Sequence, residues 1–194
     1  MRKRAVPELP PLQDLRAELK REKYRRRYFS VFGSTVSVLL VVAAAAILVA
    51  TLWLPVLQIY GSSMTPTLED GEIIFTVKTA EPETGDVIAF YYNNKILVKR
   101  VIGKAGDWVN ITEDGAVYVN EMRLDEPYVA EPALGECDLT FPYQVPDGKW
   151  FVLGDHRATS VDSRSSIVGC VAHEQIVGKI LFRVWPLNRL GAVD

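Results

Sequence analysis

The feature that most constrains this chain is an apolar run over residues 31–54, which contains no charged side chain. A helix needs about 20 predominantly apolar residues to cross the hydrocarbon core of a bilayer. The run is longer than the apolar part of a typical cleaved signal peptide, which has about 7–15 residues. The consecutive alanines 43–46 lower its hydrophobicity, so a cleaved leader is the minor alternative. The run predicts one transmembrane helix over residues 31–55.

Charge is distributed unevenly on the two sides of this run. Residues 1–30 carry ten Lys or Arg against four Asp or Glu, whereas the whole chain has a net charge of −2, so the other residues carry −8. Basic residues that flank a membrane span favour the cytoplasmic side. Solvated tails and nucleic-acid-binding arms are also basic, but the position directly before the span favours an orientation signal. We predict a cytoplasmic tail over residues 1–30, an extracytoplasmic domain over residues 56–194 and no nucleic-acid partner.

The domain after the span has the pattern of a mainly β protein. Short apolar or alternating runs are separated by turn residues such as Gly85-Asp86 and Asn93-Asn94. The pattern predicts strands over residues 73–77, 87–92, 96–102, 108–111, 116–119, 150–153 and 177–184. Thr65 followed by Pro66 is typical of a helix start, so a short helix is expected just after Ser63.

Ser63 and Lys99 are the residues with the clearest chemical potential. A serine hydroxyl becomes a useful nucleophile only when a base takes its proton, and a neutral lysine amine is such a base when burial lowers its pKa. Lys99 lies in an apolar strand pattern beside Leu97 and Val98, where an ammonium is poorly solvated. The ordinary alternatives are a surface serine, with Ser62 next to it, and a lysine on the solvent face of an edge strand.

A third segment, residues 154–164, has the sequence GDHRATSVDSR and is dense in Asp, Arg, Ser and Thr. One interpretation is a solvated loop that is hydrogen-bonded to itself. The functional interpretation is a polar support that holds a catalytic base in place.

Taken together, these segments resemble those of bacterial type I signal peptidases, membrane-bound enzymes that remove signal peptides from exported proteins. The nucleophile motif of that family is matched by residues 63–68 (SMTPTL), its lysine motif by residues 98–103 (VKRVIG), and its glycine-aspartate motif within residues 154–164. The resemblance covers about residues 31–186, with the motifs in the order of the family. It implies an antiparallel, barrel-like β domain and a membrane-anchored endopeptidase that cuts after small residues.

The resemblance also implies roles for the matched residues. Ser63 is implied as the nucleophile and Lys99 as the general base, with Ser160 orienting the lysine. Three charged residues are implied to brace the site: Asp155, Asp162 and Arg164. Four apolar residues are implied to line the pockets for the small residues before the cut: Met64, Leu68, Leu97 and Val98. The implied partners are signal peptides of exported preproteins and the lipid bilayer, with no cofactor and no metal; the oligomeric state is left open.

Two positions depart from the commonest pattern of the family. His156 stands where many members have Asn, so an Asp155–His156 pair is an alternative base. Gly61 stands where some members have a serine that helps to stabilise the oxyanion, so the Ser63 backbone N–H and a second, unidentified donor are expected to do so here. His173-Glu174 resembles half of a zinc-protease motif, but Val177 occupies the second histidine position.

Other functions are left open by the sequence. A self-cleaving Ser–Lys protease of the SOS-repressor type has a similar catalytic domain, but such proteins are soluble, and the apolar run argues against one. A membrane-anchored interaction protein with an inactive domain is the other alternative, against which the intact Ser63, Lys99 and Ser160 argue. Cys137 and Cys170 lie in the predicted extracytoplasmic domain, where they either form a disulfide or stay as separate thiols.

Overall fold

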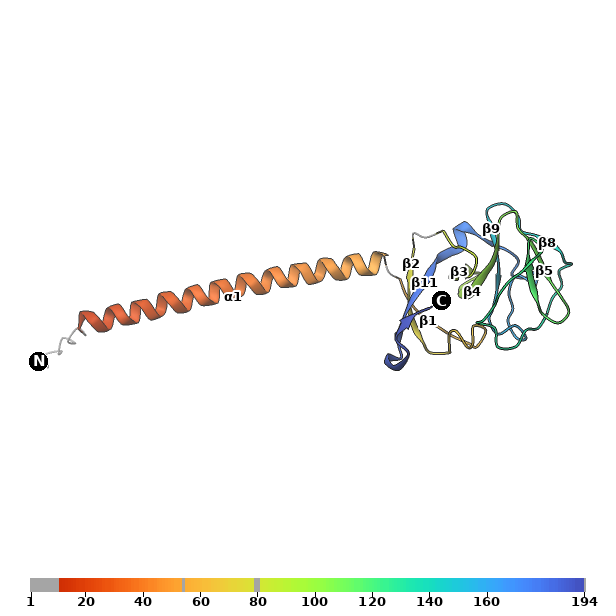
Figure 1. The fold of residues 1–194 in the computed structure, drawn as a ribbon. Coiled ribbons are helices and arrows are strands. Elements are labelled where there is room, and N and C mark those ends of the chain that lie inside the picture. Colours follow the sequence, from red (N-terminus) through yellow and green to blue (C-terminus); the bar gives the residue numbers. More distant parts are fainter. Residues whose placement is uncertain (1–10, 54, 79–80, 194) are drawn as a thin grey trace, which may run out of the picture. The chain divides into compact units, whose positions relative to one another are not determined.

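The computed structural model describes residues 11–53, 55–78 and 81–193 (Figure 1). The chain divides into two compact units, a helical one up to Val49 and a β unit from Ala50 onward. The first ten residues of the predicted tail, and Leu54 at the end of the predicted apolar run, lie outside the described residues.

One uninterrupted helix, α1 over Leu12–Trp53, makes up the described part of the first unit, and its last turn falls in the second. It joins the polar segment before the apolar run to the apolar run itself, because that part of the sequence contains no proline to end the helix. Over Leu12–Val49 the helix is long and apolar enough to cross a bilayer. This agrees with the apolar span expected from the sequence.

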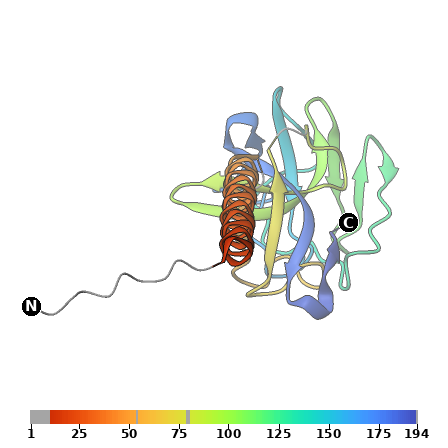
Figure 2. The same ribbon diagram turned by 90° about the vertical axis from the view of Figure 1, so that its left-hand side faces the viewer.

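The β unit contains an eight-stranded antiparallel sheet in the order β1-β2-β11-β3-β4-β9-β10, with β12 paired to β11. Long strands β11 and β2 lie side by side in Figures 1 and 2. The strands of this sheet are β1 Val56–Gln58, β2 Ile73–Val77, β3 Val87–Tyr92, β4 Lys95–Lys104, β9 Lys149–Leu153, β10 Val171–Ala172, β11 Ile176–Trp185 and β12 Gly191–Ala192.

A second, four-stranded sheet has the order β7-β6-β5-β8. Its strands are β5 Trp108–Ile111, β6 Val117–Val119, β7 Met122–Arg123 and β8 Tyr143–Gln144. Two 3-10 helices complete the unit, η1 His173–Gln175 and η2 Leu187–Arg189. The prediction of a mainly β, antiparallel fold after one apolar helix is confirmed.

All seven strands predicted from the sequence are present, three of them with the predicted bounds. The turn at Asn93 is also as expected, since Asn93 has a φ of 50° at the tip of the β3–β4 hairpin. The sequence did not predict β1, β7, β8, β10 and β12, each of which has only two or three residues.

The helix predicted after Ser63 is wrong, because the chain forms successive turns there. A helix N-cap accepts a hydrogen bond from a later backbone N–H. Thr65 Oγ1 instead donates to the carbonyl of Ser62 at 2.8 Å. Met64 and Leu68 are both buried in one hydrophobic cluster under this segment, with Ile74 and Ile180 from the sheet. Burial of these two side chains therefore fixes the turn and overrides the local helix signal.

Cys137 and Cys170 are not joined by a disulfide. The thiol of Cys137 donates to the carbonyl of Leu139 at 3.6 Å, and Cys170 packs against the cluster between the two sheets. The two cysteines are therefore separate thiols, which is the second of the two arrangements that the sequence left open.

Candidate active site

Ser63 and Lys99 meet in the β unit, although they are far apart in the sequence. Ser63 lies in the turn that follows Gly61, and Lys99 lies on β4. Nζ of Lys99 is 2.6 Å from Oγ of Ser63, a hydrogen-bond distance. A positive φ of 91° at Gly61 lets the chain turn before the serine, and burial of Met64 after it fixes the turn. The serine hydroxyl is thus held against the lysine amine.

Burial changes the ionisation of Lys99. Its side chain is only 3% exposed, and this removal from water lowers the pKa of the amine from 10.5 to about 8. Negative charge on Asp162 and Asp155 opposes the shift, and positive charge on Arg164 adds to it. A substantial fraction of the amine is therefore neutral near pH 8 and able to accept a proton.

Two buried arginine–aspartate pairs surround the lysine. Arg164 holds Asp162 through two hydrogen bonds of 2.9 Å each, and Arg100 holds Asp155 through bonds of 3.0 and 2.8 Å. All four residues are at most 1% exposed. Each carboxylate is therefore matched by a guanidinium, so the aspartates raise the pKa of Lys99 less than unpaired carboxylates would.

The buried ion pairs include one residue outside the set that the family resemblance implied. The charged residues implied to brace the site were Asp155, Asp162 and Arg164, and the structure joins only the last two directly. Asp155 pairs with Arg100, which the sequence reasoning missed as a site residue. The available signal was its position next to Lys99 inside the matched lysine motif.

The loop over residues 154–164 is tied to the segment that carries Ser63. Thr67 donates its hydroxyl to Asp155, and the backbone N–H of His156 donates to the carbonyl oxygen of Ser63 at 3.1 Å. The backbone N–H of Gly154 donates to Asp162 at 2.9 Å. These bonds tie Asp155 and His156 to the serine segment and Asp162 to Gly154 within its own loop. Since Asp155, Asp162 and Arg164 are buried, this is not a solvated surface loop.

Gly154 and Ser160 are in close contact at the centre of this loop. A Cβ placed on Gly154 would lie 2.1 Å from Ser160 Oγ and 2.6 Å from the carbonyl oxygen of Ser63. Ser160 Oγ is buried and has no hydrogen-bond partner in the described part of the chain. The Lys99–Ser160 hydrogen bond that the family resemblance implies is thus not formed in this structure. Only glycine fits at position 154, which sequence reasoning placed in the motif but not among the site residues.

The contacts of His156 and Asp155 differ from those that a catalytic Asp–His pair would need. The ring Nδ1 of His156 lies 2.6 Å from the hydroxyl of Thr159. The carboxylate of Asp155 is bound by Arg100 and Thr67. The geometry therefore does not support the alternative base formed by Asp155 and His156.

A cleft of about 720 Å³ opens beside Ser63 and Lys99. It is lined by residues from the segments 56–64 and 95–99, among them Met64, Leu97 and Val98. Leu68 is not part of this lining, since it is fully buried in the cluster beneath it. Three of the four residues implied to contact substrate thus face the cleft, and the fourth supports Met64 from below.

Two strand edges border the cleft. β4 pairs with β3 over residues 95–100 but with β9 only from Arg100 onward. β1 pairs with β2. Within the described residues, the other edges of β1 and of residues 95–99 have no strand beside them. An extended peptide could therefore pair with this edge of the sheet.

The segment over residues 126–138, unexplained by the sequence, packs against the arginines of the site. The side chain of Glu126 pairs with Arg157, whose Nε donates to the carbonyl of Gly154 at 3.1 Å. The ring of Tyr128 lies 3.8 Å from the Arg100 guanidinium carbon. Burial raises the pKa of Tyr128, so the phenol stays neutral. The sequence held no motif that pointed to these contacts.

Comparison with known proteins shows the family of this chain. The family model described as signal peptidase, peptidase S26, matches residues 32–185. The chain is 35% identical over 187 residues to signal peptidase I of Bacillus licheniformis, covering 89% of this chain and 98% of that protein. It is 41% identical over 151 residues to signal peptidase IB of Staphylococcus aureus strain Mu50, covering 67% of this chain and 77% of that protein.

The chain belongs to the S26 family of signal peptidases. It is a serine endopeptidase of this family. The solved structure of signal peptidase I from Enterococcus faecalis V583 is 32% identical in sequence, with a TM-score of 0.45, and covers 52% of this chain and 97% of that one. As an S26 signal peptidase with one membrane-length apolar helix among its described residues, the protein is a single-pass membrane protein.

Proposed function

We propose that this signal peptidase removes signal peptides from exported preproteins with Ser63 as nucleophile and Lys99 as general base. The observation that carries the proposal is the 2.6 Å contact between the serine Oγ and a buried lysine amine whose pKa is lowered to about 8. A nucleophile within hydrogen-bond reach of a base that is neutral near the working pH is what acyl transfer requires.

The reaction proceeds in two acyl-transfer steps. Neutral Lys99 removes the proton of the Ser63 hydroxyl as the oxygen attacks the scissile carbonyl, and backbone N–H groups, including that of Ser63, hold the oxyanion. The Lys99 ammonium then gives its proton to the leaving amine, which frees the mature protein and leaves an ester on Ser63. Lys99 next deprotonates a water that hydrolyses this ester, and Ser63 is regenerated.

The supporting residues hold the reacting groups in place and do not react themselves. Asp162 and Asp155, neutralised by Arg164 and Arg100, keep the loop at Gly154 against the serine backbone. Ser160 lies buried against Gly154 and acts as a positioning residue for Lys99 during turnover. A side chain that is buried without a partner has hydrogen-bonding capacity to offer when the amine moves.

The substrate binds as an extended segment in the cleft between β1 and β4. Its backbone pairs with the edge at residues 95–99, and its side chains alternate toward the cleft floor. Met64, Leu97 and Val98 present apolar surface there, which suits the small residues that precede the cut. Leu68 holds the position of Met64 from the cluster below.

The membrane orientation follows from charge. Six basic residues lie just before the apolar run: Lys20, Arg21, Lys23, Arg25, Arg26 and Arg27. They keep the N-terminal segment in the cytoplasm and place the β unit outside it, on the side where a signal peptide leaves the bilayer. The substrate class is therefore the preprotein whose signal peptide spans the same membrane.

The test is cleavage of a purified preprotein in lipid vesicles by the full chain. Ser63→Ala and Lys99→Ala are each expected to lower the rate by about a thousandfold or more. The matched controls Ser62→Ala and His156→Ala are expected to stay within a few-fold of wild type. Thermal melting of every variant separates lost chemistry from lost folding. Normal cleavage by folded Lys99→Ala together with an inactive His156→Ala would overturn the base assignment.

A further inference from the structure

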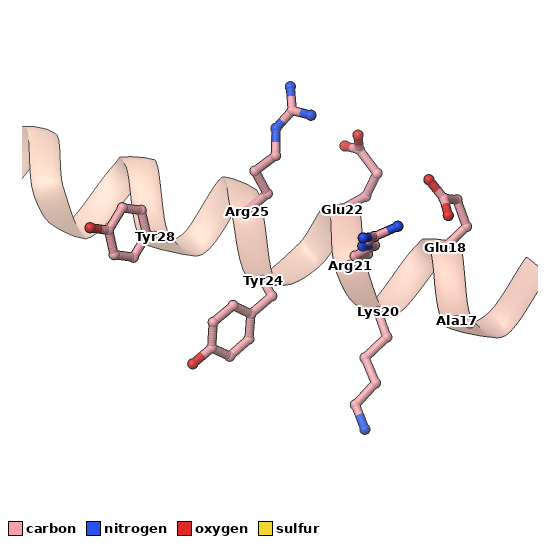
Figure 3. A pocket seen from close by; sticks show the side chains of 8 residues that line it. All are labelled: Ala17, Glu18, Lys20, Arg21, Glu22, Tyr24, Arg25 and Tyr28. Carbon is pink, nitrogen blue, oxygen red and sulfur yellow. The ribbon is translucent and has the colours of Figure 1, made fainter.

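A second group of buried charges contacts the segment that carries Ser63. Basic side chains on α1, such as those of Arg21 and Arg25, are exposed and project away from the helix (Figure 3). Arg183 on β11 is different, because its side chain is only 12% exposed and pairs with Glu72, whose side chain is 2% exposed. Removing two charges from water is costly unless further hydrogen bonds satisfy them. The other partners of this pair therefore show what it holds together.

The serine lies in a closed loop over residues 59–72, which we call the Ser63 loop. At its base, the backbone N–H of Ile59 donates to the carbonyl of Glu72 at 2.8 Å, and the N–H of Gly71 donates to the carbonyl of Ile59 at 2.9 Å. Between these ends the chain forms turns and bends, with no strand or helix. Such a segment has no regular ladder of backbone hydrogen bonds, so its shape depends on bonds from neighbouring elements.

Arg183 bridges the base of the Ser63 loop and its interior. Its Nη1 donates to both carboxylate oxygens of Glu72, at 2.8 and 3.0 Å, and to the carbonyl oxygen of Thr67 at 3.2 Å. Glu72 is the last residue of the loop. Nη2 of Arg189 donates to the carbonyl of Pro66 at 3.3 Å. Two consecutive carbonyl groups of the loop thus accept hydrogen bonds from arginine side chains.

The sheet places Arg183 beside the base of the loop. β11 pairs with β2, and Arg183 is the partner of Ile74, two residues after Glu72. The register of this pairing shifts before Arg183, between Ile180 and Phe182, and again directly after it. Bulges of this kind re-aim a side chain and are frequent next to active sites. The position of the arginine is therefore set by the sheet and not by the loop that it contacts.

Thr67 connects this contact to the active site. Its carbonyl accepts from Arg183, while its hydroxyl donates to Asp155. The carbonyl of Ser63 itself accepts from the backbone N–H of His156. Two separate parts of the fold, the polar loop and strand β11, thus hold the Ser63 loop.

We infer that Arg183 is a positioning residue for the proposed reaction, because it fixes the Ser63 loop so that the serine hydroxyl stays within reach of Lys99. The inference rests on Ser63 as the proposed nucleophile. Arg183 does not line the cleft, so its loss should lower kcat and leave the binding of the preprotein largely unchanged.

The first test is cleavage of a preprotein in vesicles by the full chain, at a temperature well below the melting of every variant. In Arg183→Met, kcat is expected to fall about tenfold or more with KM within about twofold of wild type, because the serine is no longer held at the reacting distance. Lys179→Met is the matched control. Lys179 also lies on β11 and pairs at 2.7 Å with Asp86, which is outside the Ser63 loop. Normal kcat in folded Arg183→Met, or an equal fall in both variants, would overturn the inference.

Arg183→Lys separates positioning from stability, and it decides the question if Arg183→Met does not fold. The lysine keeps a positive charge beside Glu72, but its amine ends one bond short of Nη1 and cannot also reach the carbonyl of Thr67. The melting temperature should therefore lie closer to wild type than that of Arg183→Met, whereas kcat should be about as low. A kcat that returns to the wild-type value together with the melting temperature would mean that Arg183 only stabilises the fold.

Ser63→Ala in the same assay distinguishes this inference from the proposed function. An inactive Ser63→Ala with low kcat in both Arg183 variants supports the two together. An inactive Ser63→Ala with normal kcat in both Arg183 variants would overturn the positioning role alone. Normal cleavage by Ser63→Ala would overturn the nucleophile and the positioning role with it.

Discussion

Gly154 lies between the side chain of Ser160 and the backbone of Ser63, in a space too small for one methyl group. A Cβ at Gly154 would lie 2.1 Å from the Ser160 hydroxyl oxygen and 2.6 Å from the carbonyl oxygen of Ser63. The same glycine donates its N–H to Asp162, so it cannot move aside without breaking a buried hydrogen bond. One backbone position thus fixes the distance between the nucleophile segment and the polar loop.

Gly154→Ala is therefore expected to lower the rate of preprotein cleavage by about a hundredfold, since misplacement of a reacting group by about 1 Å costs that much. Gly191→Ala is the matched control, because a Cβ there meets nothing within 4 Å. Cleavage rates and melting temperatures of both variants are the measurement. A Gly154→Ala enzyme with wild-type activity would show that the contact does not position the site.

The rate of cleavage should depend on pH through Lys99. The neutral amine is the active form, and its pKa in the folded protein is about 8. The value of kcat/KM should therefore rise about tenfold per pH unit below pH 8 and level off above it. A rate that stays flat from pH 9 down to pH 5 would contradict a lysine base.

The stability of the folded protein should change with pH in a defined direction because of Lys99. Burial lowers the pKa of Lys99 from 10.5 to about 8, so between these values the unfolded chain binds more protons than the folded one. The contribution of Lys99 to stability therefore rises with pH across this window and is least favourable below it. Lys99→Met should raise the melting temperature relative to wild type more at pH 7 than at pH 10. An equal difference at both pH values would contradict the shift.

The buried ion pair between Asp162 and Arg164 should be costly to break. Asp162→Asn leaves a fully buried guanidinium without its counter-charge and is expected to destabilise the protein by about 3–5 kcal/mol. Because Asp162 raises the pKa of Lys99, the pH profile of any folded fraction should also move to lower pH. Denaturant unfolding and kinetics measure the two effects.

An exposed pair gives the comparison for that experiment. Glu69 pairs with Arg189 at 2.7 Å, and its side chain is 57% exposed. Glu69→Gln should change stability by no more than about 1 kcal/mol, because water screens such pairs. Equal losses in Asp162→Asn and Glu69→Gln would mean that burial does not set the importance of these ion pairs.

Much of the β unit could be predicted from the sequence because its long strands have clear local signals. Strands β2, β3 and β5 are apolar or alternating runs bounded by turn residues, and each has the predicted bounds. The two-residue strands β7, β8, β10 and β12 contain too few residues to show a period. They are strands only because a neighbouring strand pairs with them.

The site shows the same division between local and long-range information. Ser63 and Lys99 stood out by their motifs, and the structure brings them together. The partner of Asp155 did not stand out, since Arg100 is 55 residues away and reaches it only through the sheet. The helix signal at Thr65 failed because burial of Met64 and Leu68 decides the local backbone. Glu126 and Tyr128 belong to no motif, and only the fold places them on the arginines.

The proposed mechanism depends most directly on the ionisation of Lys99 in the folded protein. An NMR titration of the full chain with 13C-labelled lysine, in which the Lys99→Arg spectrum identifies the Lys99 signal, measures it. A lysine base predicts a midpoint near pH 8, shared with the ascending limb of the cleavage rate. A midpoint near the ordinary lysine value of about 10.4 would contradict the assignment of Lys99 as the general base.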